Sequence, residues 1–336
     1  MFNKAYVKIK KFIMENHNFL LFLILLLIVL NIKLPYIVER PGGLINLNNQ
    51  IKINNKNING NYNSSYVAVN DGTVMSVLLS YIFPNWDLVK IDDVMQSDDM
   101  DYQDVLTLDK LSMGESQNKA IMFVFDKLSI PYTIESEELY VYNKLDDFDN
   151  DLKYSDKIIK CNDQDVKSFD DLTKCINNDF DDEVKLLVKR KNREVKVYAR
   201  SKEIDGKKII GVGIYRNFNL KSDYSITFDN YSSEYGPSAG FMTALALYDN
   251  LSKENLSGSL KIAGTGTIDE SGNVGEIDGI KYKLLGAEKK KVDVYFVPAA
   301  NYSEAVKVKK KHKLKLNIVK VSQFDDAVNY LKEMNS

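Results

Sequence analysis

Residues 235–251 read YGPSAGFMTALALYDNL, with a proline and a serine between two glycines and a long apolar run behind them. The run predicts a buried helix, and Pro237 fits its first position because the N–H that proline lacks would have no partner there. Ser238 then lies in the first turn. Gly236 lets backbone approach a substrate closely, and free N–H groups at a helix start, including that of Ala239, can hold a developing oxyanion. The stretch therefore suits either an acyl-transfer nucleophile or an ordinary helix cap.

Histidine is scarce, and this limits the choice of a base for Ser238. The only two are His17, which precedes the apolar N-terminal run, and His312, which lies in the basic stretch KVKKKHKLK and is expected to be solvated. A Ser-His-Asp triad or a histidine metal site therefore lacks the necessary residues. The remaining base for a serine is a lysine or a carboxylate.

A lysine that accepts a proton must be neutral, which at pH near 7.5 requires burial because its reference pKa is about 10.4. The stretch EIDGIKYKLLGAEKKK predicts a helix whose apolar stripe consists of Ile280, Leu284 and Ala287. Lys283 falls beside this stripe and Lys281 lies farther round the helix. The helical spacing thus favours Lys283 by a small margin.

The segment before this region predicts a strand, a short helix and a hairpin. The helix SFDDLTKCINN has a capping box from Ser168 to Asp171, and DEVKLLVKRKNREVKVYARS alternates as a hairpin does. Cys161 and Cys175, 14 residues apart, fit neither a metal-ligand pattern nor a CxxC pair. A disulfide between them is an open alternative that the sequence does not favour. From about residue 203 strands and helices alternate, which predicts a mixed α/β domain with its own core.

The N-terminus predicts a membrane anchor. Residues 19–30 are 12 consecutive apolar residues, about 18 Å as helix, and extension to Val38 gives 20 residues and about 30 Å, enough to span a bilayer. Four lysines precede the run, at positions 4, 8, 10 and 11, and place residues 1–18 in the cytoplasm. The alternatives are a cleaved signal peptide, for which no small-residue cleavage site follows, and a cytoplasmic protein with a misread leader.

Composition excludes several function classes. The 336 residues carry a formal net charge of −2 and exceed the usual length of a single domain, so no basic field attracts nucleic acid and more than one core is expected. No GxxxxGK[ST] sequence occurs, and the GTG at 264–266 lacks the third glycine of a dinucleotide fingerprint. We therefore expect no nucleotide partner, no metal and no cofactor.

Four motifs, YGPSAG, AGTGTID, GNVGEIDGIKYKLLGA and DVYFVPAAN, come in the order and approximate spacing of the proteolytic domain of Lon-type proteases, which are Ser-Lys dyad peptidases. The strand, helix and hairpin before them resemble the C-terminal half of a PDZ domain. With LPYIVERPGGLI and LSMGESQNKAI, the chain resembles membrane-anchored PDZ-Lon serine proteases of the YlbL/SepM kind over nearly all of residues 19–336. The resemblance implies Ser238 as nucleophile, Lys283 as base and Thr265 as the residue that helps position the lysine.

The chain departs from the family pattern in three places. Tyr235 replaces the acidic residue or glycine usual before GPSAG, and Asp278 replaces the first glycine of a GG pair before the lysine segment. A carboxylate close to Lys283 would raise the pKa of the lysine and weaken it as a base. The glycine-rich loop that binds a peptide carboxylate in PDZ domains is not recognisable.

The predicted fold class is α+β, in five parts: a cytoplasmic tail (1–18), a transmembrane anchor (19–38), an extracytoplasmic region (39–111), a PDZ-like domain (112–202) and a Lon-type domain (203–336). The predicted function is an ATP-independent serine endopeptidase that cleaves exported or membrane-proximal peptides outside the cell, held to membrane lipid by its N-terminal helix. The alternative is a non-catalytic, surface-anchored PDZ scaffold. The physiological substrate and the oligomeric state stay open.

Overall fold

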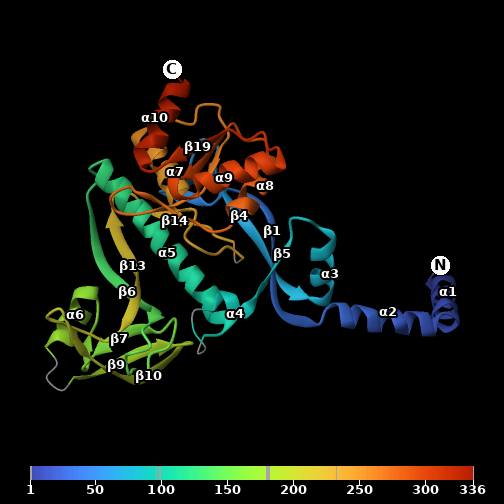
Figure 1. Cartoon of the computed structure of the whole chain (residues 1–336), viewed down its shortest axis with the longest axis horizontal. Coiled ribbons are helices and arrows are strands. Elements are labelled where there is room, and N and C mark those ends of the chain that lie inside the picture. Colours follow the sequence, from blue (N-terminus) through green and yellow to red (C-terminus); the bar gives the residue numbers. More distant parts are fainter. Residues whose placement is uncertain (1, 96, 98–99, 179–181, 232, 336) are drawn as a thin grey trace. The chain divides into compact units, whose positions relative to one another are not determined.

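The computed structural model describes residues 2–95, 97, 100–178, 182–231 and 233–335; the side chain of Lys4, one of the four predicted tail lysines, also lies outside the described part. The fold is mixed α+β (Figure 1). It divides into two compact units, Met1–Pro41 with Val67–Val94, and Gly42–Tyr66 with Met95–Ser336. Strands β1 (Lys33–Asn46) and β4 (Tyr62–Thr73) each run from one unit into the other.

The first unit begins with α1 (Phe2–Glu15) and α2 (His17–Leu30). The predicted helix over 19–38 is wrong beyond Leu30, because the chain turns there and residues 33–38 belong to β1. Tyr36 to Glu39 pair antiparallel with β5 (Asp87–Lys90), which satisfies backbone groups that a helix would have used. Pro35 also opposes helix at the residue before it.

Taken singly, no helix among the described residues is long and apolar enough to cross a bilayer. The pair Tyr6–Glu15 and His17–Leu30, bent by 80°, meets the requirement in length and composition. The unit is completed by α3 (Val74–Ile82) and α4 (Ile91–Val94). A reciprocal capping box between Thr73 and Ser76 starts α3.

In the second unit, a six-stranded sheet follows the order β10-β9-β7-β6-β13, with β8 paired to β7. We call it the small sheet; its strands are β6 (Tyr132–Lys144), β7 (Lys157–Cys161), β8 (Gln164–Asp165), β9 (Glu183–Arg190), β10 (Arg193–Arg200) and β13 (Val212–Ser222). The predicted hairpin is confirmed as β9 and β10. The predicted helix is α6 (Phe169–Asn177), where the Ser168 side chain accepts from the Asp171 N–H. The Asp171 carboxylate accepts from the N–H of Lys167 at 3.0 Å.

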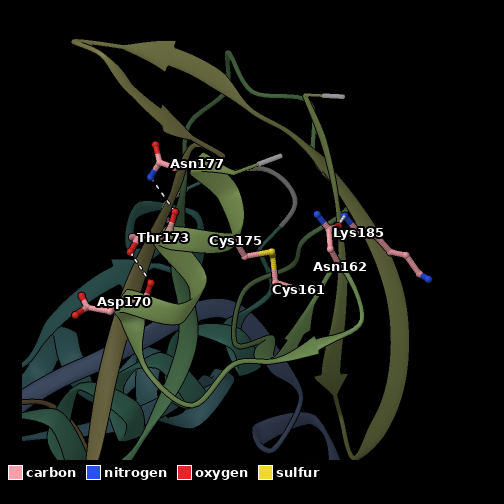
Figure 2. The surroundings of a disulfide bond; sticks show 7 residues. All are labelled: Cys161, Asn162, Asp170, Thr173, Cys175, Asn177 and Lys185. Atoms are coloured by element: carbon pink, nitrogen blue, oxygen red, sulfur yellow. Dashed lines mark hydrogen bonds between the residues drawn. A yellow bond between two sulfur atoms is a disulfide. The ribbon is translucent and has the colours of Figure 1, made fainter. Parts of the chain in front are cut away.

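Cys161 and Cys175 form a disulfide, the alternative that the sequence did not favour. Figure 2 shows how the bond joins the end of β7 to α6. The two Cα atoms are 6.2 Å apart, within disulfide range. The packing of α6 on the small sheet brings the two side chains together, which spacing along the chain could not reveal.

Around Ser238, a parallel sheet in the order β19-β18-β15-β4 forms the C-terminal core. Its strands are β15 (Ile262–Gly264), β18 (Val294–Pro298), β19 (Ile318–Val321) and the Tyr62–Ser64 part of β4. Val294 and Phe296 point into a core with α7 (Gly240–Ser252) and α10 (Phe324–Asn335). Tyr295 and Val297 point into a second core with α8 (Ile280–Glu288) and α9 (Ala299–His312). Both faces are covered, as is usual for parallel strands.

Helix α5 (Tyr102–Lys127) is 26 residues long, and the predicted domain boundary at 111/112 falls inside it. The predicted boundary at 202/203 precedes β13, which pairs with β6 in the small sheet. The remaining elements are short: η1 (Leu47–Asn49), β2 (Ile51–Ile53), β3 (Lys56–Asn57), β11 (Lys202–Ile204), β12 (Lys207–Ile209), β14 (Ile226–Phe228), β16 (Thr267–Ile268) and β17 (Val274–Gly275).

Candidate active site

Ser238 lies in a turn that precedes α7, outside the helix. The helix begins at Gly240 with Ala239 as its N-cap, so the prediction of Pro237 as first helical residue is wrong. The Ser238 carbonyl accepts from the Gly266 N–H at 2.8 Å, and the Pro237 carbonyl accepts from the Gly240 N–H at 3.1 Å. These bonds turn the chain tightly and delay the helix. Ser238 is half-buried.

The segment after β15 holds this turn from one side. The Gly266 N–H donates to the Ser238 carbonyl, and the Gly266 carbonyl accepts from the Phe241 N–H at 3.0 Å. The Thr265 hydroxyl donates to the same Ser238 carbonyl at 3.2 Å. Two of these bonds therefore fix the Ser238 carbonyl, and the third fixes the first turn of α7.

Gly236 gives the turn its backbone shape. Its φ of +87° lies in the left-handed region, which glycine adopts without strain, and an added Cβ would meet nothing within 4 Å. The requirement for glycine is therefore conformational rather than steric.

Within the described part of the chain, the N–H groups of Ser238 and Ala239 have no hydrogen-bond acceptor. Two free donors beside the serine hydroxyl suit a developing oxyanion.

Lys283 is buried on α8, with 4% of its surface exposed, among the apolar residues Ile280, Leu284 and Ala287. Its Nζ donates to the Thr265 hydroxyl at 3.1 Å. Burial lowers the pKa of Lys283 from 10.5 to about 8, against the opposing charge of Asp278. A useful fraction of Lys283 is therefore neutral near pH 7.5. Thr265 contacts both the lysine and the backbone of the serine, so one side chain connects the two candidate residues.

Asp278 acts on Lys283 in the direction that its place in the sequence suggests, raising the lysine pKa, but burial has the larger effect. The carboxylate is exposed, so water and salt screen its charge. Tyr235 is 39% exposed. Lys110 Nζ lies 5.1 Å from the Tyr235 ring centroid, a cation–π contact. With both of these residues in place, Lys283 is buried and bonded to Thr265.

The sequence did not predict that α5 takes part in this site. The Ser116 hydroxyl donates to the Pro237 carbonyl at 2.8 Å, and the Asp109 carbonyl accepts from the Gly236 N–H at 3.0 Å. The contacts are separated by more than a hundred residues, and no local pattern marks them. Among the described residues, no group of three or more His, Cys, Asp or Glu side chains is arranged to hold a metal ion.

Residues 221–333 match the family model of the Lon protease (S16) C-terminal proteolytic domain. A Lon-type proteolytic domain is present. The match covers Ser238, Thr265 and Lys283, and such a domain indicates a serine peptidase. Its start within β13 lies closer to the end of the small sheet than the predicted boundary at 203 does.

Curated Lon proteases align with the same Lon-type domain. That of the Aster yellows witches'-broom phytoplasma is 29% identical over 116 residues, 34% of this chain and 14% of the relative. The Lon protease of Campylobacter jejuni is 30% identical over 120 residues, 35% of this chain and 14% of the relative. That of Heliobacterium modesticaldum is 32% identical over 118 residues, with shares of 35% and 14%. The aligned part thus spans about one seventh of these relatives.

Proposed function

We propose that this chain is an ATP-independent serine endopeptidase of the PDZ-Lon kind, anchored in a membrane and acting on exported or membrane-proximal peptides. The observation that carries the catalytic part is the bonding of Thr265, whose hydroxyl accepts from buried Lys283 and donates to the Ser238 carbonyl. The Lon-type domain supports peptidase chemistry, and the lowered lysine pKa supports a base other than histidine.

In the proposed reaction, neutral Lys283 takes the proton of the Ser238 hydroxyl as Oγ bonds to the scissile carbonyl carbon. The carbonyl electrons move to oxygen, which the N–H groups of Ser238 and Ala239 hold. When the C–N bond breaks, the Lys283 ammonium protonates the leaving amine and an acyl-enzyme remains. Water then attacks the ester with Lys283 again as base, which releases the acid and restores both residues.

Cleavage of a library of exported peptides by the full chain in detergent tests the dyad. Wild type, Ser238→Ala and Lys283→Ala are compared with Lys281→Ala, which alters a half-buried lysine on the same helix. We expect cleavage by wild type and the Lys281 variant only. Equal cleavage by all four proteins would end the dyad proposal.

Without a nucleotide motif to power unfolding, we propose that substrates are flexible peptides. ATP should leave the rate unchanged, and a stably folded protein should survive while its unfolded form is cut. Degradation of the folded form would refute this part of the proposal.

The membrane part rests on the first unit. Helix α2 is apolar from Phe19 to its end, and α3 exposes Leu78, Tyr81 and Ile82, at 52%, 81% and 69%. Phe83 stacks on Trp86 at 5.0 Å beyond α3, a pairing suited to a membrane interface. The disulfide supports an oxidising compartment for the small sheet.

Trp86 is the only tryptophan, so its fluorescence reports on this unit alone. In vesicles of brominated phosphatidylcholine we expect its emission to be quenched relative to vesicles of the unbrominated lipid. Equal emission in both, with strong quenching by aqueous iodide, would place Trp86 in water and contradict the interfacial location. This readout is independent of cleavage.

The small sheet gives little support to the alternative function, a non-catalytic scaffold. Binding by strand addition needs an open strand edge. At the outer edge of β13, the Asn118 side chain already donates to the Phe218 carbonyl at 3.0 Å and accepts from the Phe218 N–H at 3.2 Å. A peptide would have to displace this contact.

A further inference from the structure

Helix α5 packs on two partners at once. It contacts α7 of the Lon-type domain and β13 of the small sheet, as Figure 1 shows. Ser116 and Asn118 are two residues apart and so lie on nearly opposite sides of the helix. One side reaches the turn that carries Ser238, and the other reaches β13.

On the first side, the contact with the turn is close. Ser116 is 6% exposed, and its Oγ lies 2.8 Å from the Pro237 carbonyl oxygen. A Cβ added at Gly240 would come within 2.2 Å of that Oγ, so glycine at this position lets the helix approach. Two turns earlier along α5, the Asp109 carbonyl accepts from the Gly236 N–H. The helix therefore holds both residues that directly precede the nucleophile, Gly236 and Pro237.

On the second side, α5 is fixed to the edge of β13. Asn118 bonds to both backbone groups of Phe218, as a neighbouring strand would, and the Glu115 carboxylate accepts from the Arg216 N–H at 3.4 Å. These bonds set how deeply α5 sits between the sheet and α7. The depth in turn sets where the Ser116 hydroxyl meets the turn.

We propose that Ser116 is a positioning residue for the nucleophile, which holds the Pro237 carbonyl so that Ser238 Oγ is aimed for attack. The inference rests on the proposed peptidase function and adds a residue to it. The hydroxyl touches neither substrate nor reacting atoms. It acts by limiting the freedom of the turn, and small misplacements of a reacting group are known to slow catalysis strongly.

Ser116→Ala in the full chain tests the proposal, with Thr107→Ala as the control. Thr107 is an exposed residue of the same helix, and its hydroxyl donates to the Gln103 carbonyl at 2.7 Å, so the substitution also removes one hydroxyl from α5. With a fluorogenic peptide chosen from those that wild type cleaves, we expect Ser116→Ala to lower kcat about tenfold with KM changed less than twofold. Such a drop corresponds to about 1.4 kcal/mol, the size of one hydrogen bond. The control should keep kcat within twofold.

Amide hydrogen exchange provides a readout that needs no activity. In Ser116→Ala, the segment 236–241 should exchange at least several times faster than in wild type, while the middle of α7 stays unchanged. Unchanged exchange in the segment would overturn the proposal, as would faster exchange without a fall in kcat, or equal falls in kcat for both variants. If wild type cleaves no peptide, the peptidase proposal fails, and the exchange result still decides whether Ser116 holds the turn.

Discussion

Replacement of Lys283 by methionine should abolish peptidase activity and yet stabilise the protein at neutral pH. Methionine keeps the length and approximate volume of the side chain and removes the charge. Because Lys283 is surrounded by apolar side chains, folding takes a charged group out of water. The variant no longer carries that penalty.

The magnitude follows from the lowered pKa. The pKa of Lys283 falls from 10.5 to about 8, and each tenfold change in protonation equilibrium is worth 1.36 kcal/mol. The burial penalty is therefore about 3 kcal/mol at pH 7. Below pH 8 both states bind the proton and the penalty is fully present. Between pH 8 and 10.5 the unfolded chain binds more protons than the native one, so stability of the wild type rises with pH.

Pulse proteolysis of the full chain at increasing urea concentrations, followed on its C-terminal fragment, measures the free energy of unfolding. At pH 7, Lys283→Met should be about 3 kcal/mol more stable than wild type. Loss of the hydrogen bond to Thr265 reduces this gain. The advantage should shrink as pH rises through 8 toward 10.5. Lys281→Met, in the half-buried position on the same helix, should stay within about 0.5 kcal/mol of wild type at pH 7. A variant less stable than wild type at pH 7, or an advantage that does not change with pH, would refute the reasoning.

Three further outcomes are expected. Asp278→Asn removes a charge that raises the pKa of the active-site lysine, so the acid limb of the pH–rate profile, near pH 8 in wild type, should move to lower pH. The shift should be less than about one unit because the carboxylate is exposed. A shift to higher pH would contradict this prediction. Joint replacement of Cys161 and Cys175 by alanine should lower the stability of the small sheet by about 3 kcal/mol, seen as an earlier thermal transition that reductant reproduces in wild type, with kcat unchanged. Gly240→Ala should lower kcat at least about tenfold, because its Cβ would meet a hydroxyl at 2.2 Å; steady-state kinetics with a parallel melting curve separates this from unfolding.

Elements with strong local signals could be predicted from the sequence. The N-cap Ser168 and the alternating strands around Lys191 are determined by residues a few positions apart, and both features are present in the structure. The apolar stripe of α8 indicated which of two lysines is buried. Burial along a regular helix follows from periodicity alone.

Features set by contacts between distant segments could not be predicted. Helix α5 packs against α7 on one side and β13 on the other, so its buried residues do not form a single stripe. Pairing with β5 ends the N-terminal helix earlier than hydropathy suggests. The disulfide depends on how α6 lies against β7. In each case a partner far along the chain overrides a local preference.

The turn at Ser238 shows the same conflict at the site itself. A proline followed by an apolar run locally favours a helix that starts at Pro237, and the helix starts three residues later. Thr265 and Ser116 explain the delay: the first bonds to the Ser238 carbonyl across 27 residues, and the second bonds to the Pro237 carbonyl across 121. Both carbonyls thereby have a partner outside α7, and the N–H of Ser238 is left without an acceptor among the described residues. A helix that started at Pro237 would have used the Ser238 carbonyl for its own ladder and lost the bond to Thr265, the side chain that also holds Lys283.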